Sequence, residues 1–258
     1  MTIDFNKLRE RLDKLRAKGE KKDRKPSSEV YFKINKGQDK IIRIVDYPHA
    51  DDPFVETWHH YNIGPIMSVY CPKYNHGGKC PICDAVSKLY ETGLPRDKEL
   101  AGRTRARARY FSPIIDRTDS EFKLRWWGYP PTVFDKLIDH ALDPDYQDGG
   151  KCLTDLDKGR DITVSKPLED KKAVNIKVKP KSSKAHSDAK ELEAAIAELP
   201  DLHENPPWKI YSEDELFELV KNLSNSSGEG EETKPGDIAD LRSRLGDIVK
   251  PEEADIPF

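Results

Sequence analysis

Residues 103–111 read RTRARARYF, with arginine at every second position followed by Tyr110 and Phe111. A period of two is that of a β-strand, in which successive side chains point to opposite faces of the sheet. Alanine and arginine also favour helix, but the chain continues as a strand-like RYFSPII, and Pro113 would end a helix. We therefore expect a strand. One face would carry Arg103, Arg105, Arg107, Arg109 and Phe111, and the other Ala106, Ala108 and Tyr110.

Further strand-like segments lie on both sides of this row. They are short, rich in β-branched and aromatic residues, and occupy residues 30–34, 40–47, 54–61, 105–115, 122–129, 160–166 and 173–181. A helix is expected at 130–142 with Thr132 as its N-cap. Two more helices begin near Ser187 and Ser212, and Ser212 with Glu215 matches the capping-box pattern. This order predicts a mainly β protein with peripheral helices (α+β), built as a small barrel or sandwich with insertions.

The 258 residues carry a net charge of −3, but the charges are unevenly distributed. Residues 201–258 hold fifteen acids and six bases, which leaves residues 1–200 with a net positive charge. A basic body with an acidic tail is typical of proteins that handle nucleic acid. We divide the chain into a basic N-terminal arm (1–27), a folded body (28–223) and a flexible acidic tail (224–258).

The sequence also carries signals about the compartment. No apolar run approaches the ~18 residues of a membrane span. The N-terminal residues lack the apolar stretch of a secretory signal. We therefore expect a cytoplasmic protein without membrane contact, whose four cysteines serve as metal ligands or free thiols rather than disulfides.

The segment CPKYNHGGKCPIC, residues 71–83, predicts a metal site. Its CPIC step lets Cys80 and Cys83 face one ion, and Cys71 supplies a third thiolate. Three histidines could be the fourth ligand: His76, inside the loop, or His59 or His60, upstream of it. If residues 54–61 form a strand, His59 and His60 point to opposite faces, so only one of them can be a ligand. A closed site of this kind has no open position, which makes a zinc ion here structural rather than catalytic.

The same parity argument applies to FKLRWWGY, residues 122–129. It places Lys123, Arg125 and Trp127 on one face of a strand. Cations that neutralise phosphates and rings that stack on unpaired bases are what single-stranded nucleic acid requires. The alternative is a charged edge strand that resists aggregation. We predict that the arginines at 103, 105, 107 and 109 contact phosphates with Lys123 and Arg125, and that Phe111 and Trp127 stack on bases.

No catalytic motif competes with this interpretation. The sequence contains no phosphate-binding P-loop, dinucleotide fingerprint or nucleophile elbow, so we expect a protein that is not an enzyme. The tail ends with EEADIPF, in which acids precede Asp255, Ile256, Pro257 and Phe258. Such a peptide fits a hydrophobic pocket with a basic rim on a partner protein.

Taken together, these motifs resemble a known family. The histidine followed by C…CPIC, the RARYF that follows soon after, and KLRWWGYPPTVFDKLID are similar to the single-stranded DNA-binding (helix-destabilising) proteins of T-even phages. The resemblance covers roughly residues 28–222. The tip ADIPF resembles instead the C-terminal tip of bacterial single-stranded DNA-binding proteins.

The resemblance implies an OB-fold barrel with an inserted structural zinc subdomain, here about residues 58–90. It places the fourth zinc ligand upstream of Cys71, which favours His60 or His59 over His76, and His60 fits the family's register better. It also implies that the arm mediates self-association on DNA. The expected function is non-sequence-specific binding of single-stranded DNA in phage replication, recombination and repair, with host or phage proteins recruited through the tip. The alternative is a zinc-stabilised adaptor that binds proteins and not DNA.

Overall fold

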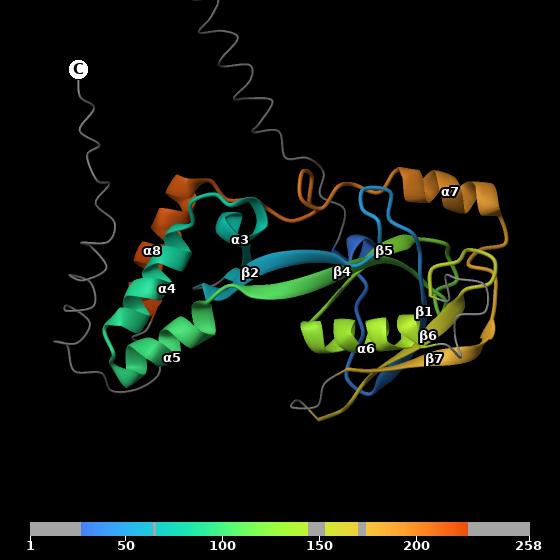
Figure 1. The fold of residues 1–258 in the computed structure, drawn as a ribbon, viewed down its shortest axis with the longest axis horizontal. Coiled ribbons are helices and arrows are strands. Elements are labelled where there is room, and N and C mark those ends of the chain that lie inside the picture. The colour runs from blue at the N-terminus through green and yellow to red at the C-terminus, as the bar shows by residue number, and fades with distance from the viewer. Residues whose placement is uncertain (1–26, 64–65, 144–152, 170–173, 227–258) are drawn as a thin grey trace, which may run out of the picture.

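The computed structural model describes residues 27–63, 66–143, 153–169 and 174–226. These residues form a mainly antiparallel sheet with several helices, as the strand pattern predicts (Figure 1). The strands are β1 (Gln38–Ile44), β2 (Val55–Ile63), β3 (Ile66–Tyr70), β4 (Arg107–Asp116), β5 (Leu124–Tyr129), β6 (Arg160–Lys166) and β7 (Asn175–Ser182). The helices are α2 (Ser27–Val30), α3 (Pro72–His76), α4 (Pro81–Glu91), α5 (Pro95–Thr104), α6 (Pro131–Leu142), α7 (Ala189–Ala197) and α8 (Glu213–Ser226).

The strand order is β3-β2-β4-β1-β6-β7, and β5 pairs with β4 beside this path. Every named strand pair is antiparallel. The pairings among the described strands do not close the sheet on itself. The structure is therefore α+β, and the expected OB-fold barrel is not confirmed.

Strand β4 is central because it pairs with three strands. β2 pairs with its first half, from Arg107 to Phe111, and β1 pairs with its last residues, from Ile114 to Asp116. Pro113 lies between these two registers, and its carbonyl accepts a hydrogen bond from the Val45 amide at 3.1 Å. In an extended strand the N–H and C=O of one residue point to the same side. Proline cannot return this bond to Val45, and the β1–β4 ladder stops at the neighbouring pair of Ile44 and Ile114, where β4 changes partners.

Helices cover both faces of the sheet, and we name the faces after them (Figure 1). On the α6 face, Ile114 of β4 packs with Val133 and Leu137 of α6 in one apolar cluster. On the α7 face, Leu192 of α7 packs with Ile115 of β4. The same face is also covered by the segment after α7, whose Leu199, Leu202 and Trp208 pack around Phe111 and Trp126.

Helices α3, α4, α5 and α8 gather at one end of β2 and β4 and form, together with β3, what we call the metal lobe (Figure 1). Its apolar core includes Ile82 and Leu89 of α4 together with Ala101 of α5. Leu216 and Val220 of α8 are buried in the same core. Helix α8, the last of the described helices, thus completes the core of a lobe whose other elements lie much earlier in the sequence.

Several local predictions can be compared with the structure. The capping box is confirmed, because Ser212 N donates to Glu215 Oε2 at 2.9 Å and Glu215 N donates to Ser212 Oγ at 3.3 Å. Thr132 is not an N-cap, because α6 begins at Pro131 after Pro130. The predicted strand at 30–34 is wrong: α2 ends at Val30, and Tyr31 forms an isolated bridge to Trp126 and is not part of a named strand.

Candidate functional site

Four buried side chains meet in the metal lobe: His60 of β2, Cys71 before α3, and Cys80 and Cys83 at the start of α4. Their ligand atoms all lie within 4.8 Å of one another. This cluster could hold a metal ion such as zinc. The parity argument is confirmed, because His60 joins the cluster while His59 lies on the other face, paired with Arg107.

Three of the distances between ligand atoms are close to those of a tetrahedral zinc site. Zinc bound to sulfur at ~2.3 Å and to nitrogen at ~2.0 Å places ligand atoms about 3.5–3.8 Å apart. The Cys71 and Cys83 sulfurs are 3.5 Å apart, and His60 Nε2 lies 3.4 Å from the sulfurs of both Cys80 and Cys83. Three thiolates and an imidazole are a donor set typical of structural zinc.

The second nitrogen of His60 is also engaged. Nδ1 lies 2.9 Å from the carbonyl oxygen of Thr104, which can only accept a hydrogen bond. Nδ1 therefore donates this hydrogen bond, and Nε2 is the nitrogen that faces the sulfurs. Thr104 is the last residue of α5, where carbonyl groups lack helical partners. An orienting bond of this kind is usual for histidine ligands.

The electrostatics of the cluster also favour a cation. Cys83 is pushed toward its neutral form, because hydrogen bonds with Cys71 and Cys80 raise its pKa. The same contacts with Cys80 and Cys83 lower the pKa of Cys71. Burial alone would lower the pKa of His60, but its contacts with Cys71 and Cys80 outweigh burial and raise it to about 9. The pKa values of Cys71 and Cys83 are thus driven in opposite directions, and a divalent cation would favour the thiolate form of both.

Asn75 ties α3 to β2 beside the cluster. Its amide donates to the carbonyls of Trp58 at 2.9 Å and Cys71 at 2.7 Å, and its Oδ1 accepts from the Trp58 amide at 2.9 Å. The side chain acts as a short strand partner for β2. His76, the alternative ligand, lies outside the cluster and is hydrogen-bonded to the Tyr70 hydroxyl at 3.1 Å.

The structure divides the arginine row. Arg103 belongs to the last turn of α5, where it pairs with Glu99 at 2.5 Å, and Arg105 caps that helix. The prediction that both lie on the strand is wrong, since β4 begins at Arg107. The helical preference of residues 95–104, which start with proline and carry buried Ala101 and Thr104, overrides the alternation there.

Arg107 and Arg109 do occupy one face of β4, as predicted. Arg107 donates to the carbonyl of Gly102 at 2.8 Å and Arg109 to that of Gly128 at 2.7 Å. Among the described residues neither guanidinium forms an ion pair, so both positive charges remain uncompensated.

Arg109 borders a recess of about 290 Å³ on the α7 face. The residues that line this recess are His59, Tyr61, Ser68, Arg109 and Phe111. Burial raises the pKa of Tyr61, and the charges of Arg109 and Arg107 oppose that rise. Burial and Arg109 lower the pKa of His59 to about 4, which leaves its imidazole neutral at neutral pH.

The two predicted stacking residues are buried. Phe111 is 8% exposed, lies 5.0 Å from the Trp208 ring, and only lines the floor of the recess. Trp127 is 4% exposed within the core beneath α6. The prediction that Trp127 offers its ring to a base is therefore wrong. It also lies opposite Ser112, on the α6 face, and thus on the other side of the sheet from Phe111.

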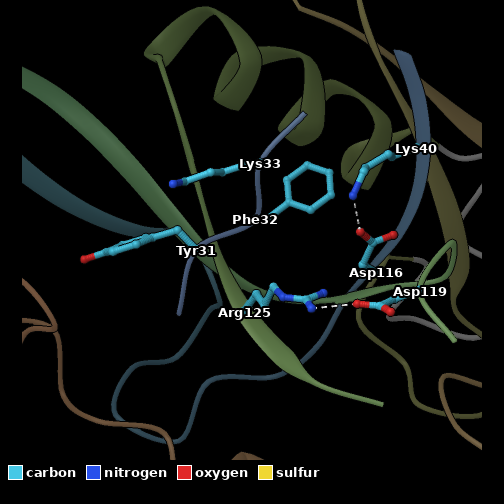
Figure 2. Close-up of a pocket in the computed structure, with 7 residues that line it drawn as sticks. All are labelled: Tyr31, Phe32, Lys33, Lys40, Asp116, Asp119 and Arg125. Atoms are coloured by element: carbon cyan, nitrogen blue, oxygen red, sulfur yellow. Dashed lines mark hydrogen bonds and ion pairs between the residues drawn. The ribbon is translucent and has the colours of Figure 1, made fainter. Parts of the chain in front are cut away.

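Lys123 and Arg125 are placed beside carboxylates. Lys123 pairs with Glu121 at 2.7 Å and Arg125 with Asp119 at 2.6 Å. Arg125 lines a pocket of about 210 Å³. A second ion pair in this pocket, Lys40 with Asp116, lies beside the ring of Phe32 (Figure 2). These carboxylates would repel a phosphate, so this pocket suits phosphate less well than the recess does.

The predicted tip residues Asp255, Ile256, Pro257 and Phe258 lie outside the described residues, as does the arm up to residue 26. The sequence did not indicate a binding role for Tyr61 and Ser68 of the recess. The same is true of Trp58, Tyr110 and Phe134, which are half-buried on the α6 face. The parity of β2 could have identified Tyr61, which shares a face with His59.

Within the described ranges, none of the helices is both long and apolar enough to cross a membrane. No protein-family model matches this chain, and comparison with curated proteins found no significant match.

Proposed function

We propose that this protein binds single-stranded DNA without sequence preference and is not an enzyme. The proposal includes a zinc ion at His60, Cys71, Cys80 and Cys83 with a structural role. It also includes a relationship to the OB-fold, for which the antiparallel sheet with a helix packed on it is the support. In the phage setting suggested by the resemblance, it would act in replication, recombination and repair in the host cytoplasm.

The observation that carries the proposal is the recess on the α7 face. It combines the uncompensated charge of Arg109, with Arg107 nearby, and the ring of Tyr61, while the buried Phe111 contributes to its lining. Phosphates bind to guanidinium groups through charge-assisted hydrogen bonds. Unpaired bases have exposed ring faces that aromatic side chains can contact, whereas duplex DNA keeps those faces stacked inside the helix. The recess therefore suits a single strand better than a duplex.

The metal cluster lies on the opposite face of β2 from the recess and supports it. Its ligand His60 lies next to His59, which lines the recess, and its ligand Cys71 directly follows β3, which contributes Ser68. A zinc ion at the cluster would hold β2 and β3 in register beneath the recess. Its contribution would be to position the residues of the recess and not to react with DNA.

A titration of fluorescently labelled oligo-dT, followed by anisotropy at several salt concentrations, tests the proposal. We expect affinity for the single strand to exceed affinity for a duplex of the same length. The logarithm of the binding constant should fall linearly with that of the salt concentration, by about 0.7 per phosphate contacted. No binding, or equal binding of the duplex, would contradict the proposal.

The rival function is an adaptor that binds proteins through its arm and tail. If this function is correct, the protein should not bind oligo-dT at any salt concentration. Recruitment of replication and repair proteins through the tip, and self-association through the arm, are further parts of the proposal. Deleting the last eight residues should leave DNA binding intact and abolish recruitment alone.

A further inference from the structure

Four aromatic side chains follow one another across the α6 face: Tyr74 of α3, Trp58 of β2, Tyr110 of β4 and Phe134 of α6. We call them the aromatic row. Tyr74 stacks on Trp58 with ring centroids 4.8 Å apart and planes inclined by 22°. Tyr110 stacks on Phe134 at 4.0 Å with an angle of 1°. Trp58 lies opposite Ala108, two residues along β4 from Tyr110, so the two stacked pairs lie on the same face of the sheet.

One carboxylate joins the two pairs. Glu56 accepts a hydrogen bond from Trp58 Nε1 at 2.7 Å through one oxygen and from the Tyr110 hydroxyl at 2.6 Å through the other. The polar groups of Trp58 and Tyr110 are thereby satisfied within the protein. What these two side chains offer to a ligand is therefore their ring faces.

The exposure of these rings is unusual for a core. Trp58, Tyr110 and Phe134 are half-buried, and Tyr74 is 56% exposed although its ring is held flat against Trp58. Asn75, the next residue in α3, is fixed to β2 by three hydrogen bonds. Tyr74 is thus a rigid ring with an open outer face. Such a ring can accept a partner without losing side-chain freedom.

We infer that the aromatic row is a second contact surface for the single strand, on which Tyr74 stacks an unpaired base. This inference rests on the proposed function and extends it to the opposite face of β2 and β4. Glu56 sets the orientation of the bound strand. Its negative charge repels phosphates, so the bases turn toward the row and the phosphates turn toward solvent. The recess presents arginines and the row presents ring faces, so the two faces contact different parts of the strand.

A comparison of two oligonucleotides tests this inference. One is oligo-dT, and the other is an abasic strand with the same number of phosphates. Tyr74→Ala should weaken binding of oligo-dT about tenfold, since one stacked base contributes ~1–3 kcal/mol. It should leave binding of the abasic strand unchanged. Tyr74→Phe keeps the ring and should bind oligo-dT like the wild type.

The matched control is Tyr90→Ala, because Tyr90 is also an exposed tyrosine of the metal lobe, at 42%. It should not change affinity for either strand. The inference is overturned if Tyr74→Ala binds oligo-dT as well as the wild type, or loses affinity equally for both strands. Binding of neither strand by the wild type would instead refute the proposed function, which separates the two failures. Zinc content and circular dichroism confirm that each variant is folded.

Discussion

His60 donates a hydrogen bond from Nδ1 to the carbonyl oxygen of Thr104, 2.9 Å away. The bond joins the end of β2 to the end of α5 and turns Nε2 toward Cys80 and Cys83. Metal binding then needs no rotation of the ring, and only the proton on Nε2 has to leave. The site is organised by the fold before any ion arrives.

We predict one tightly bound zinc per chain, lost on replacement of His60. His60→Ala removes one of four ligands and leaves three buried thiols without their cation. His59→Gln, one residue earlier, is the matched control and should retain the metal. Zinc content after dialysis, measured by mass spectrometry, decides between them. Equal zinc in both variants would show that His60 is not a ligand.

Asn75→Ala should destabilise the protein by about 2 kcal/mol, because it removes three hydrogen bonds and leaves two carbonyls and an amide without these partners. Urea unfolding of the zinc-loaded protein measures the change. Asn175→Ala, at an exposed position of β7, should stay within about 0.5 kcal/mol of the wild type.

The arginines of the row should differ in their effect on DNA binding. Arg107→Gln and Arg109→Gln should each reduce the salt dependence of oligo-dT binding by about 0.7 in log–log slope. Arg103→Gln should not, because Arg103 lies in α5 and is paired with Glu99. The same anisotropy titration supplies the slopes. An equal change in all three variants would point to net charge rather than to a site.

Asp116 should make stability depend on acid. Burial would raise the pKa of Asp116, but Lys40 at 2.7 Å and the contacts with Thr118 outweigh burial and hold the pKa below its usual range. Its contribution is thus complete above the unfolded pKa of ~3.9 and disappears as the pH falls through the lower folded value. Asp116→Asn should be less stable than the wild type at pH 7, and the gap should close below about pH 4. Urea unfolding across this pH range measures the difference in stability between Asp116→Asn and the wild type. Both proteins lose zinc in acid, so this loss does not contribute to the difference.

Two glycine-to-alanine substitutions should change the stability of the protein in opposite directions. A Cβ at Gly128 would lie 2.7 Å from Cε1 of Phe111, so Gly128→Ala should cost about 1–3 kcal/mol. At Gly102 in α5 the nearest contact is Tyr90 Oη at 3.8 Å, so Gly102→Ala should gain up to about 1 kcal/mol through helix propensity. Thermal unfolding of the two variants compares them directly.

The sequence alone predicts the parts of this protein that depend on local chemistry. The CPIC spacing identifies the thiolates, the alternation of β2 separates His59 from His60, and the capping box marks the start of α8. Each of these signals involves residues close together in the chain.

What could not be predicted depends on distant segments. The arginine row is split because α5 claims Arg103 and Arg105, and a period of two does not reveal where a helix ends. Parity correctly places Phe111 beside Arg109, but it cannot foresee that Trp208, almost a hundred residues later, covers the ring. Tyr74 was overlooked because its value lies in the stacking partner Trp58, which belongs to another element.

The docking of α8 onto the metal lobe has a consequence for the order of folding. A growing chain exposes Cys83 and the apolar side of α4 long before Leu216 and Val220 leave the ribosome. Until α8 arrives, the lobe has an open apolar flank, and zinc captured by the nascent chain would hold a half-built structure together. A metal bound at this site would thus preserve the early segment until α8 closes over it.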